Sequence, residues 1–165
     1  MNKQMTQTEW RRGPHTISTD RARLDIEAVH DYLANHSYWA LGRSLEVVRR
    51  SVEHSLCFGL YEGERQVGFA RAVTDYATFA YLADVYVLEE ARGRGLGKWL
   101  VSTVLAHPDL QGLRRWLLAT RDAHELYRPF GFRELERPEF YMGILNEGGG
   151  GGRFVAEGED GGSAG

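Results

Sequence analysis

Apolar residues recur with two different spacings along this chain, and the spacings predict alternating strands and helices. Runs rich in β-branched, aromatic and leucine side chains predict strands at 15–19, 56–61, 66–74, 79–88 and 116–119. The second and third runs are separated by a short Glu-Gly-Glu-Arg segment, which is typical of a β-hairpin. Most of the predicted strands are therefore neighbours in sequence.

Four segments carry apolar residues at helical spacing. The first begins at Asp25, whose carboxylate suits an N-cap, and the second covers about 44–53. A third helix follows a glycine-rich stretch and ends at about residue 106. A short fourth helix is expected to start with Asp122 as its cap and to end before Gly131.

The chain divides by composition into three parts. We expect a flexible, polar N-terminus at 1–13, one folded domain at 14–146, and a disordered tail rich in Gly and Glu at 147–165. Two further strands, at 132–134 and 140–145, would close the domain. The predicted fold class is α/β, or mixed α+β, with about six to seven strands flanked by about four helices.

Composition excludes several classes of function. The net charge of the 165 residues is -3 and no long basic stripe is present, so nucleic acid is not an expected partner. The chain has one cysteine, Cys57, and therefore no internal disulfide; we interpret this residue as part of the core. No signal-peptide pattern and no membrane-length apolar run occur, so we expect a cytoplasmic location and no membrane partner. No spacing of His, Cys, Asp and Glu suggests a metal site.

The segment 91–100 carries the strongest functional signal. Three glycines alternate with other residues between a predicted strand and a predicted helix, an arrangement that directs backbone N–H groups toward a phosphate. The dinucleotide fingerprint fails because Lys98 stands where its third glycine belongs, and the ATP-binding P-loop fails because Arg92 replaces its first glycine. The pattern [R/Q]-x-x-G-x-[G/A] is met by Arg92, Gly95 and Gly97. A surface turn that only needs flexible glycines is the alternative.

This hexapeptide resembles the acetyl-CoA pyrophosphate loop of the GNAT superfamily of N-acetyltransferases. The segment 125–132, Glu-Leu-Tyr-Arg-Pro-Phe-Gly-Phe, resembles a second family segment, L-Y-x-x-x-G-F, about thirty residues later. The resemblance covers roughly 14–146 and implies a twisted mixed sheet that opens between the strands at 79–88 and 116–119, with acetyl-CoA in the opening. Family members are often dimers, so the resemblance also implies that this protein can form a homodimer.

The resemblance assigns cofactor contacts to particular residues. The backbone of the 85–87 strand end would pair with the acetyl and pantetheine groups, and the loop after Arg92 would hold the pyrophosphate. Many family members have an Asn seven residues before the helix tyrosine, where this chain has Thr120. The cofactor-binding residues predicted in this way are Val85, Tyr86, Val87, Arg92, Gly93, Arg94, Gly95, Leu96, Gly97 and Lys98.

Acetyl transfer to an amine also needs proton transfers. Tyr127 matches the family's tyrosine that protonates the leaving thiolate, although its helical spacing fits a packing role too. Asp84 is the only charged residue in the apolar run 79–88, which fits either a base for the amine or a structural ion pair with an arginine. Tyr38 and Trp39 are candidate walls of the acceptor pocket.

These observations predict an N-acetyltransferase that moves an acetyl group from acetyl-CoA directly to a primary amine of a small molecule. A protein N-terminus or lysine side chain is an alternative acceptor. A non-catalytic acyl-CoA-binding sensor on the same fold is an alternative from a different functional class.

Overall fold

A mixed sheet with the strand order β1-β2-β3-β4-β5-β6 organises the protein in a computed structural model that describes residues 6–146. All neighbouring strands are antiparallel except β5 and β6, which are parallel. The strands are β1 (Glu9–Arg12), β2 (His15–Ser18), β3 (Leu56–Glu62), β4 (Arg65–Thr74), β5 (Phe79–Val87) and β6 (Arg115–Leu117). The six-stranded mixed sheet confirms the predicted fold class.

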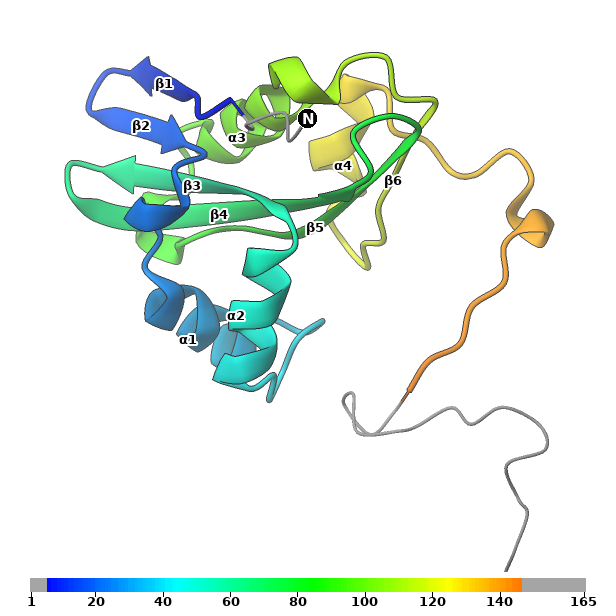
Figure 1. The fold of residues 1–165 in the computed structure, drawn as a ribbon, viewed down its shortest axis with the longest axis horizontal. Helices are drawn as coiled ribbons and strands as arrows, with labels where there is room; N and C mark the ends of the chain where they lie inside the picture. The colour runs from blue at the N-terminus through cyan, green and yellow to red at the C-terminus, as the bar shows by residue number, and fades with distance from the viewer. Residues whose placement is uncertain (1–5, 147–165) are drawn as a thin grey trace, which may run out of the picture. The chain divides into compact units, whose positions relative to one another are not determined.

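The four α-helices of the described residues cover the two faces of this sheet in pairs (Figure 1). They are α1 (Ile26–His36), α2 (Leu45–Glu53), α3 (Leu96–Leu105) and α4 (His124–Tyr127). Apolar residues of α1 and α2 form one hydrophobic cluster with Phe69 and Tyr86 of the sheet. Residues of α3 and α4 form another cluster with Phe58 and Leu82. Helix formation follows the sequence signals, since Asp25 and Ser44 cap α1 and α2 through their side chains.

A β-bulge in β5 reverses which face of the sheet the alternate side chains of this strand point toward. Phe69 pairs with Tyr86 and Arg71 with Ala83, so two residues, Asp84 and Val85, lie opposite one residue of β4. Asp84 adopts a left-handed backbone conformation with φ 54°, which is uncommon for a residue other than glycine but better tolerated by Asp than by most. Leu82, before the bulge, and Tyr86, after it, therefore belong to hydrophobic clusters on opposite faces of the sheet. The Asp84 carboxylate lies where this change of face occurs.

The sheet opens between β5 and β6, as the resemblance implied. The parallel ladder joins only Phe79–Tyr81 to Arg115–Leu117, although β5 continues for six more residues. Beyond Tyr81, the β6 side of β5 has no partner strand among the described residues. Alternate backbone groups of this part of β5 are consequently available to a ligand.

Two predictions about the ends of the domain were wrong. Residues 9–12, expected to be flexible, form β1, because their backbone pairs with β2 and Trp10 stacks on Phe58 at a ring distance of 6.3 Å. Residues 132–134 and 140–145 form no strand; instead, Pro138–Phe140 makes a 3-10 turn, and Met142 and Ile144 are 99% and 81% exposed. The apolar residues of 140–145 have no buried face, so their apolar character alone does not produce a strand.

Contacts along the chain divide it into two units, residues 1–133 and residues 134–165. The first unit contains all the helices and strands described above, whereas the predicted domain extended to 146. The expected tail at 147–165 and residues 1–5 lie outside the described residues. Asp122 does not cap α4, because the cap residue is Ala123 and its N–H donates to Oγ1 of Thr120 at 3.0 Å.

Candidate active site

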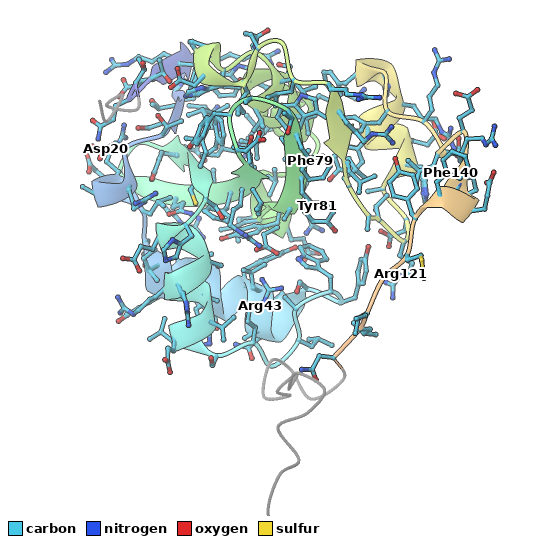
Figure 2. The ribbon with its side chains drawn as sticks, turned by 45° about the vertical axis from the view of Figure 1, so that its right-hand side comes forward. Asp20, Arg43, Phe79, Tyr81, Arg121 and Phe140 are labelled. Atoms are coloured by element: carbon cyan, nitrogen blue, oxygen red, sulfur yellow. The ribbon has the colours of Figure 1, made fainter. Side chains whose placement is uncertain are left out.

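A cleft of about 400 Å³ lies where β5 and β6 separate. One side is the middle of β5, Tyr81 to Val85, and the opposite side is the segment Ala119 to Ala123 with Tyr127. Tyr38, Trp39 and two arginines, Arg43 and Arg71, complete the lining. Figure 2 shows three of these residues, Arg43, Tyr81 and Arg121, which come from three separate segments of the chain.

The Asp84 carboxylate is held by one indole and two guanidinium groups. Oδ1 accepts from Nε1 of Trp39 at 2.9 Å and from Nη1 of Arg43 at 3.2 Å. Oδ2 accepts from Nη1 of Arg43 at 3.0 Å and from Nε of Arg71 at 2.9 Å. The Asp84 side chain is 2% exposed, and its Oδ2 lies 3.0 Å from Arg43 and 2.9 Å from Arg71, so it forms two ion pairs.

The partners of Asp84 come from elements that are distant in sequence. Arg71 lies on β4 next to the bulge and also donates to Oγ of Ser55 at 3.1 Å. Trp39 and Arg43 belong to the loop between α1 and α2, which Ser37 anchors through a 2.7 Å bond from its hydroxyl to the Leu33 carbonyl. The carboxylate thus connects this loop to β4 and β5.

Tyr38 bridges the two sides of the cleft. Its ring packs edge-on against Trp39, with ring centroids 5.1 Å apart. Its hydroxyl accepts a 2.7 Å hydrogen bond from the backbone N–H of Arg121, whose guanidinium lies 3.9 Å above the same ring. Both predicted pocket residues, Tyr38 and Trp39, therefore line the cleft.

Tyr127 contributes a buried phenol to the cleft. It is 8% exposed, and its ring meets Phe132 edge to face at 5.8 Å. Burial raises the pKa of Tyr127 to about 12, so the phenol is protonated at neutral pH. Its hydroxyl has no hydrogen-bond partner among residues 6–146, which leaves a donor available to a bound molecule.

The glycine-rich loop joins the end of β5 to α3. Gly93 and Gly95 have φ values of 80° and 74°, which explains glycine at both positions. Gly95 is the N-cap of α3 and no side chain caps this helix. The first amides of α3 consequently lack acceptors within the helix and are suited to an anion.

Two arginines of this loop have partners within the protein. Arg92 donates from Nε to the Val87 carbonyl at 2.9 Å and from Nη2 to the Tyr32 hydroxyl at 3.1 Å. It thus attaches the loop to β5 and α1. Arg94 lies 3.7 Å from a carboxylate oxygen of Glu62, and both side chains are about half exposed, so this pair is weak and readily exchanged for a ligand.

The structure brings Asp84, Val85, Tyr127, Tyr38 and Trp39 together around one cleft. The Tyr86 side chain lies elsewhere, stacked on Tyr32 at a ring distance of 3.8 Å. Residues 92–98 and Val87 are not among the residues that line this cleft.

Sequence reasoning missed the two arginines that hold Asp84. Arg71 carried a usable signal, because it is the only charged residue between the buried Val67 and Ala72 of β4. Nothing in the sequence marks Arg43, because a charged residue in a loop between two helices is common. Cys57 is buried as predicted, and burial raises the pKa of its thiol to about 12.

Residues 6–146 contain neither a cluster of metal ligands nor a membrane-spanning helix. No group of three or more His, Cys, Asp or Glu residues in this range is arranged to hold a metal ion. No helix in this part of the chain has the length and apolar character needed to span a bilayer.

Comparison with known proteins identifies the family of this chain. The model of the Acetyltransferase (GNAT) family matches residues 8–132. The chain belongs to the GNAT acetyltransferase family. A relative from Gibberella zeae, named "Putative acetyltransferase FG08082", is 34% identical over 140 residues, which cover 72% of this chain and 78% of that protein.

Solved structures with a similar fold include a protein described as a member of the same family. A crystal structure from Xanthomonas campestris, also described as a GNAT-family "putative acetyltransferase", shares 51% identity with a TM-score of 0.79, covering 81% of this chain and 94% of that one. Rv2747 from Mycobacterium tuberculosis, solved with CoA, has a similar fold at 21% identity and a TM-score of 0.60, covering 73% of this chain and 72% of that one. Acetyl-CoA is the acyl donor typical of GNAT enzymes.

Proposed function

We propose that this GNAT protein transfers the acetyl group of acetyl-CoA to a primary amine of a small molecule within a ternary complex. The observation that carries the proposal is the cleft at the opening between β5 and β6, lined on one side by strand backbone and on the other by the phenol of Tyr127. Its volume of about 400 Å³ suits a small acceptor. A cytoplasmic location and a homodimer stay predictions from the sequence.

In this proposal the cofactor occupies the open edge of β5 and the start of α3. The backbone groups of the segment Val85–Val87 that face away from β4 contact the thioester and pantetheine, and one N–H among them polarises the thioester oxygen. The amides from Gly93 to Lys98 hold the pyrophosphate, with Arg94 and Lys98 as cationic neighbours. Arg92 acts by fixing the loop to Val87.

Tyr127 assists the departure of the CoA thiolate. When the amine attacks the thioester carbon, the carbon–sulfur bond breaks and negative charge develops on sulfur. A protonated phenol beside the sulfur stabilises that charge by donating a hydrogen bond or its proton, and the proton that the attacking nitrogen releases as the amide forms balances the one that sulfur takes up. The raised pKa keeps this donor protonated throughout the neutral and moderately alkaline range.

The sequence allows Asp84 to be either a base for the amine or a structural ion-pair partner, and we propose that it positions its neighbours as an ion-pair partner. A carboxylate has about four lone-pair positions, and four hydrogen bonds already reach the oxygens of Asp84. Little capacity remains for a proton from the substrate amine. Asp84 therefore fixes Trp39, Arg43 and Arg71 around the acceptor instead of acting as its base.

The acceptor amine must still lose a proton, because a lysine-like amine has a pKa of about 10.4. The guanidinium groups of Arg43 and Arg71 line the same cleft and disfavour a further cation there. They thereby favour binding of the neutral, nucleophilic amine. We expect kcat/KM to rise by about tenfold per pH unit below the pKa of the acceptor.

The first test is thermal unfolding of the full chain with millimolar acetyl-CoA, CoA, ATP or NADH. A ligand at about 100 times its Kd stabilises a protein by about 2.7 kcal/mol, which raises Tm by several degrees. We expect only acetyl-CoA and CoA to have this effect, and acetyl-CoA to release thiol when primary amines are added. No shift with either compound, or no thiol release with any amine, would contradict the proposal.

A further inference from the structure

The floor of the cleft carries an excess positive charge that Asp84 alone does not balance. Arg43 and Arg71 share this single carboxylate, and their side chains are 25% and 13% exposed. The other lining acid, Asp122, lies 3.6 Å from Arg121, and both of these side chains are more than 60% exposed. One buried carboxylate thus faces two largely buried guanidinium groups.

Arg43 also has a complete hydrogen-bonding edge that no described residue uses. Both of its bonds to Asp84 come from Nη1. Within residues 6–146, Nε and Nη2 have no acceptor at hydrogen-bond distance, although the residue lines the cleft. Nε and Nη2 form one edge of the guanidinium with parallel N–H bonds, which is the geometry that a carboxylate accepts in a bidentate pair.

We infer that the acetyl acceptor carries a carboxylate besides its amine, and that the free edge of Arg43 binds it, so that the substrate class is amino acids or similar amino carboxylates. This inference rests on the proposed function. A single negative charge matches the single excess positive charge of Arg43, Arg71 and Asp84, whereas a phosphate monoester brings nearly two. Leaving a buried cation uncompensated is costly, so the anion completes the site.

The phosphates of CoA do not account for this charge. The proposed pyrophosphate site is the loop 93–98, and none of its residues lines the cleft that contains Arg43. The carboxylate site is therefore distinct from the cofactor contacts. It determines which amines enter the cleft.

The test compares amino acids with their carboxamides, which keep the amine and the shape but lose the charge. Acceptors are the L-α-amino acids and ω-amino acids of increasing chain length, and kcat/KM is corrected for the fraction of neutral amine. We expect at least one carboxylate to exceed its carboxamide by about tenfold or more, as for a hydrogen-bonded charge pair. Carboxamides that react as well as or better than every carboxylate would overturn the inference while leaving the proposed function intact.

Variants of Arg43 test whether this residue causes the preference for carboxylates over carboxamides. We expect Arg43→Gln to bring the ratio of carboxylate to carboxamide close to one, mainly through a higher KM for the carboxylate. Arg43→Lys keeps a charge but loses the planar edge, and it should lower the ratio in part. Arg49→Gln, an exposed position on α2, should leave the ratio at the wild-type value. An unchanged ratio in Arg43→Gln would overturn the assignment.

If no amine of the panel reacts, a binding measurement replaces the kinetic comparison. The CoA-saturated protein is titrated calorimetrically with the same carboxylates and carboxamides. Binding of a carboxylate that Arg43→Gln weakens supports the inference even without turnover. No carboxylate binding overturns it, whereas failure of acetyl-CoA to bind overturns the proposed function.

Discussion

The indole Nε1 of Trp39 donates a 2.9 Å hydrogen bond to Oδ1 of Asp84, although 45 positions separate the two residues. The bond joins the loop after α1 to the bulge of β5, and the carboxylate is buried while the indole is 39% exposed. The loop that carries Trp39 is thereby held against the opened sheet. The shape of the acceptor side of the cleft depends on this contact.

Trp39→Phe keeps an aromatic ring and removes the donor. A hydrogen bond to a charged group contributes about 1.5–3 kcal/mol, and partial exposure places the expected loss of unfolding free energy near the lower value. We expect KM for the acceptor to rise several-fold, with the Kd of acetyl-CoA unchanged. Chemical denaturation and steady-state kinetics provide both measurements.

Trp116→Phe is the matched control for this variant. Trp116 lies on β6 and does not line the cleft. Its substitution should change stability without a selective effect on the acceptor KM. Equal acceptor effects in the two variants would contradict a specific role of the Trp39–Asp84 bond.

Asp84→Asn should be among the most destabilising single changes in this protein. It leaves Arg43 and Arg71 without their carboxylate, and removal of one partner of a buried ion pair costs about 3–5 kcal/mol. Asn tolerates the left-handed backbone of position 84, so strain does not explain the loss.

A double-mutant cycle with Arg71→Gln isolates the ion pair. The combined variant should lose less free energy of unfolding than the two single variants add up to, by about 1–3 kcal/mol. Strict additivity of the losses would show that Asp84 and Arg71 are not coupled. Urea denaturation of the four proteins supplies the data.

The sequence allowed most of the central fold to be predicted, because its strands and helices bury regular apolar faces. The predicted strand at 79–88 and the helix after Gly95 match β5 and α3 closely. The prediction failed where contacts between distant segments decide the structure. Strand β1 is polar and depends on pairing with β2, and residues 140–145 have apolar side chains without a buried face.

The site was predictable only where motifs mark it. Tyr127 and the loop after Arg92 stand in recognisable patterns, and Asp84 is conspicuous as a charge in an apolar strand. The carboxylate's partners follow from the bulge, which aims Asp84 toward Arg43 and Arg71. A bulge and a left-handed aspartate leave no periodic signal, so the ion-pair network required the structure.

Gly95→Ala tests whether the start of α3 binds the cofactor. Gly95 has φ 74° and open space where an alanine Cβ would stand, so alanine costs only backbone strain, about 1–2 kcal/mol. We expect acetyl-CoA to bind at least about tenfold more weakly, because the first amides of α3 lose their orientation. Calorimetric titration with acetyl-CoA measures the change.

Gly112→Ala is the control for this backbone strain. Gly112 has a similar φ of 77° and open surroundings, but it lies in a turn outside the loop 92–98. It should destabilise the protein by a similar amount and leave acetyl-CoA binding intact. Comparable losses of affinity in both variants would show that the effect of Gly95→Ala is one of stability alone.

The buried side chain of His107 should make the protein less stable at acidic pH. This side chain is fully buried between Trp10 and Phe58, and burial lowers its pKa below the usual 6.5. The unfolded chain therefore binds a proton that the folded protein does not, so stability is lost as pH falls below about 6.5 and levels off below the folded pKa. This residue contributes a slope of up to about 1.4 kcal/mol per pH unit.

Urea denaturation of wild type and His107→Gln between pH 8 and pH 5 tests this contribution. The variant should be less stable at pH 8 but lose less free energy of unfolding on acidification. His54→Gln, at an exposed position, should keep the wild-type slope. If His107→Gln keeps it as well, protonation of His107 does not drive the acid sensitivity.

Tyr127→Phe distinguishes a catalyst from an acyl-CoA sensor. The hydroxyl has no partner within residues 6–146, so its removal should change stability by less than about 1 kcal/mol. We expect kcat to fall by about a hundredfold or more, as for loss of a proton donor, with the Kd of acetyl-CoA unchanged. In wild type, the pKa of about 12 implies that ionisation of Tyr127 does not lower kcat between pH 7 and pH 10.

Tyr61→Phe is the control for the loss of a buried phenol. Burial likewise raises the pKa of Tyr61 to about 12, but this residue does not line the cleft between β5 and β6. Its variant should retain the wild-type kcat. If Tyr127→Phe also retains full turnover, Tyr127 only packs against Phe132, and the leaving thiolate must be stabilised by another group. If wild type binds acetyl-CoA but transfers to no amine, the sensor alternative replaces the catalytic one.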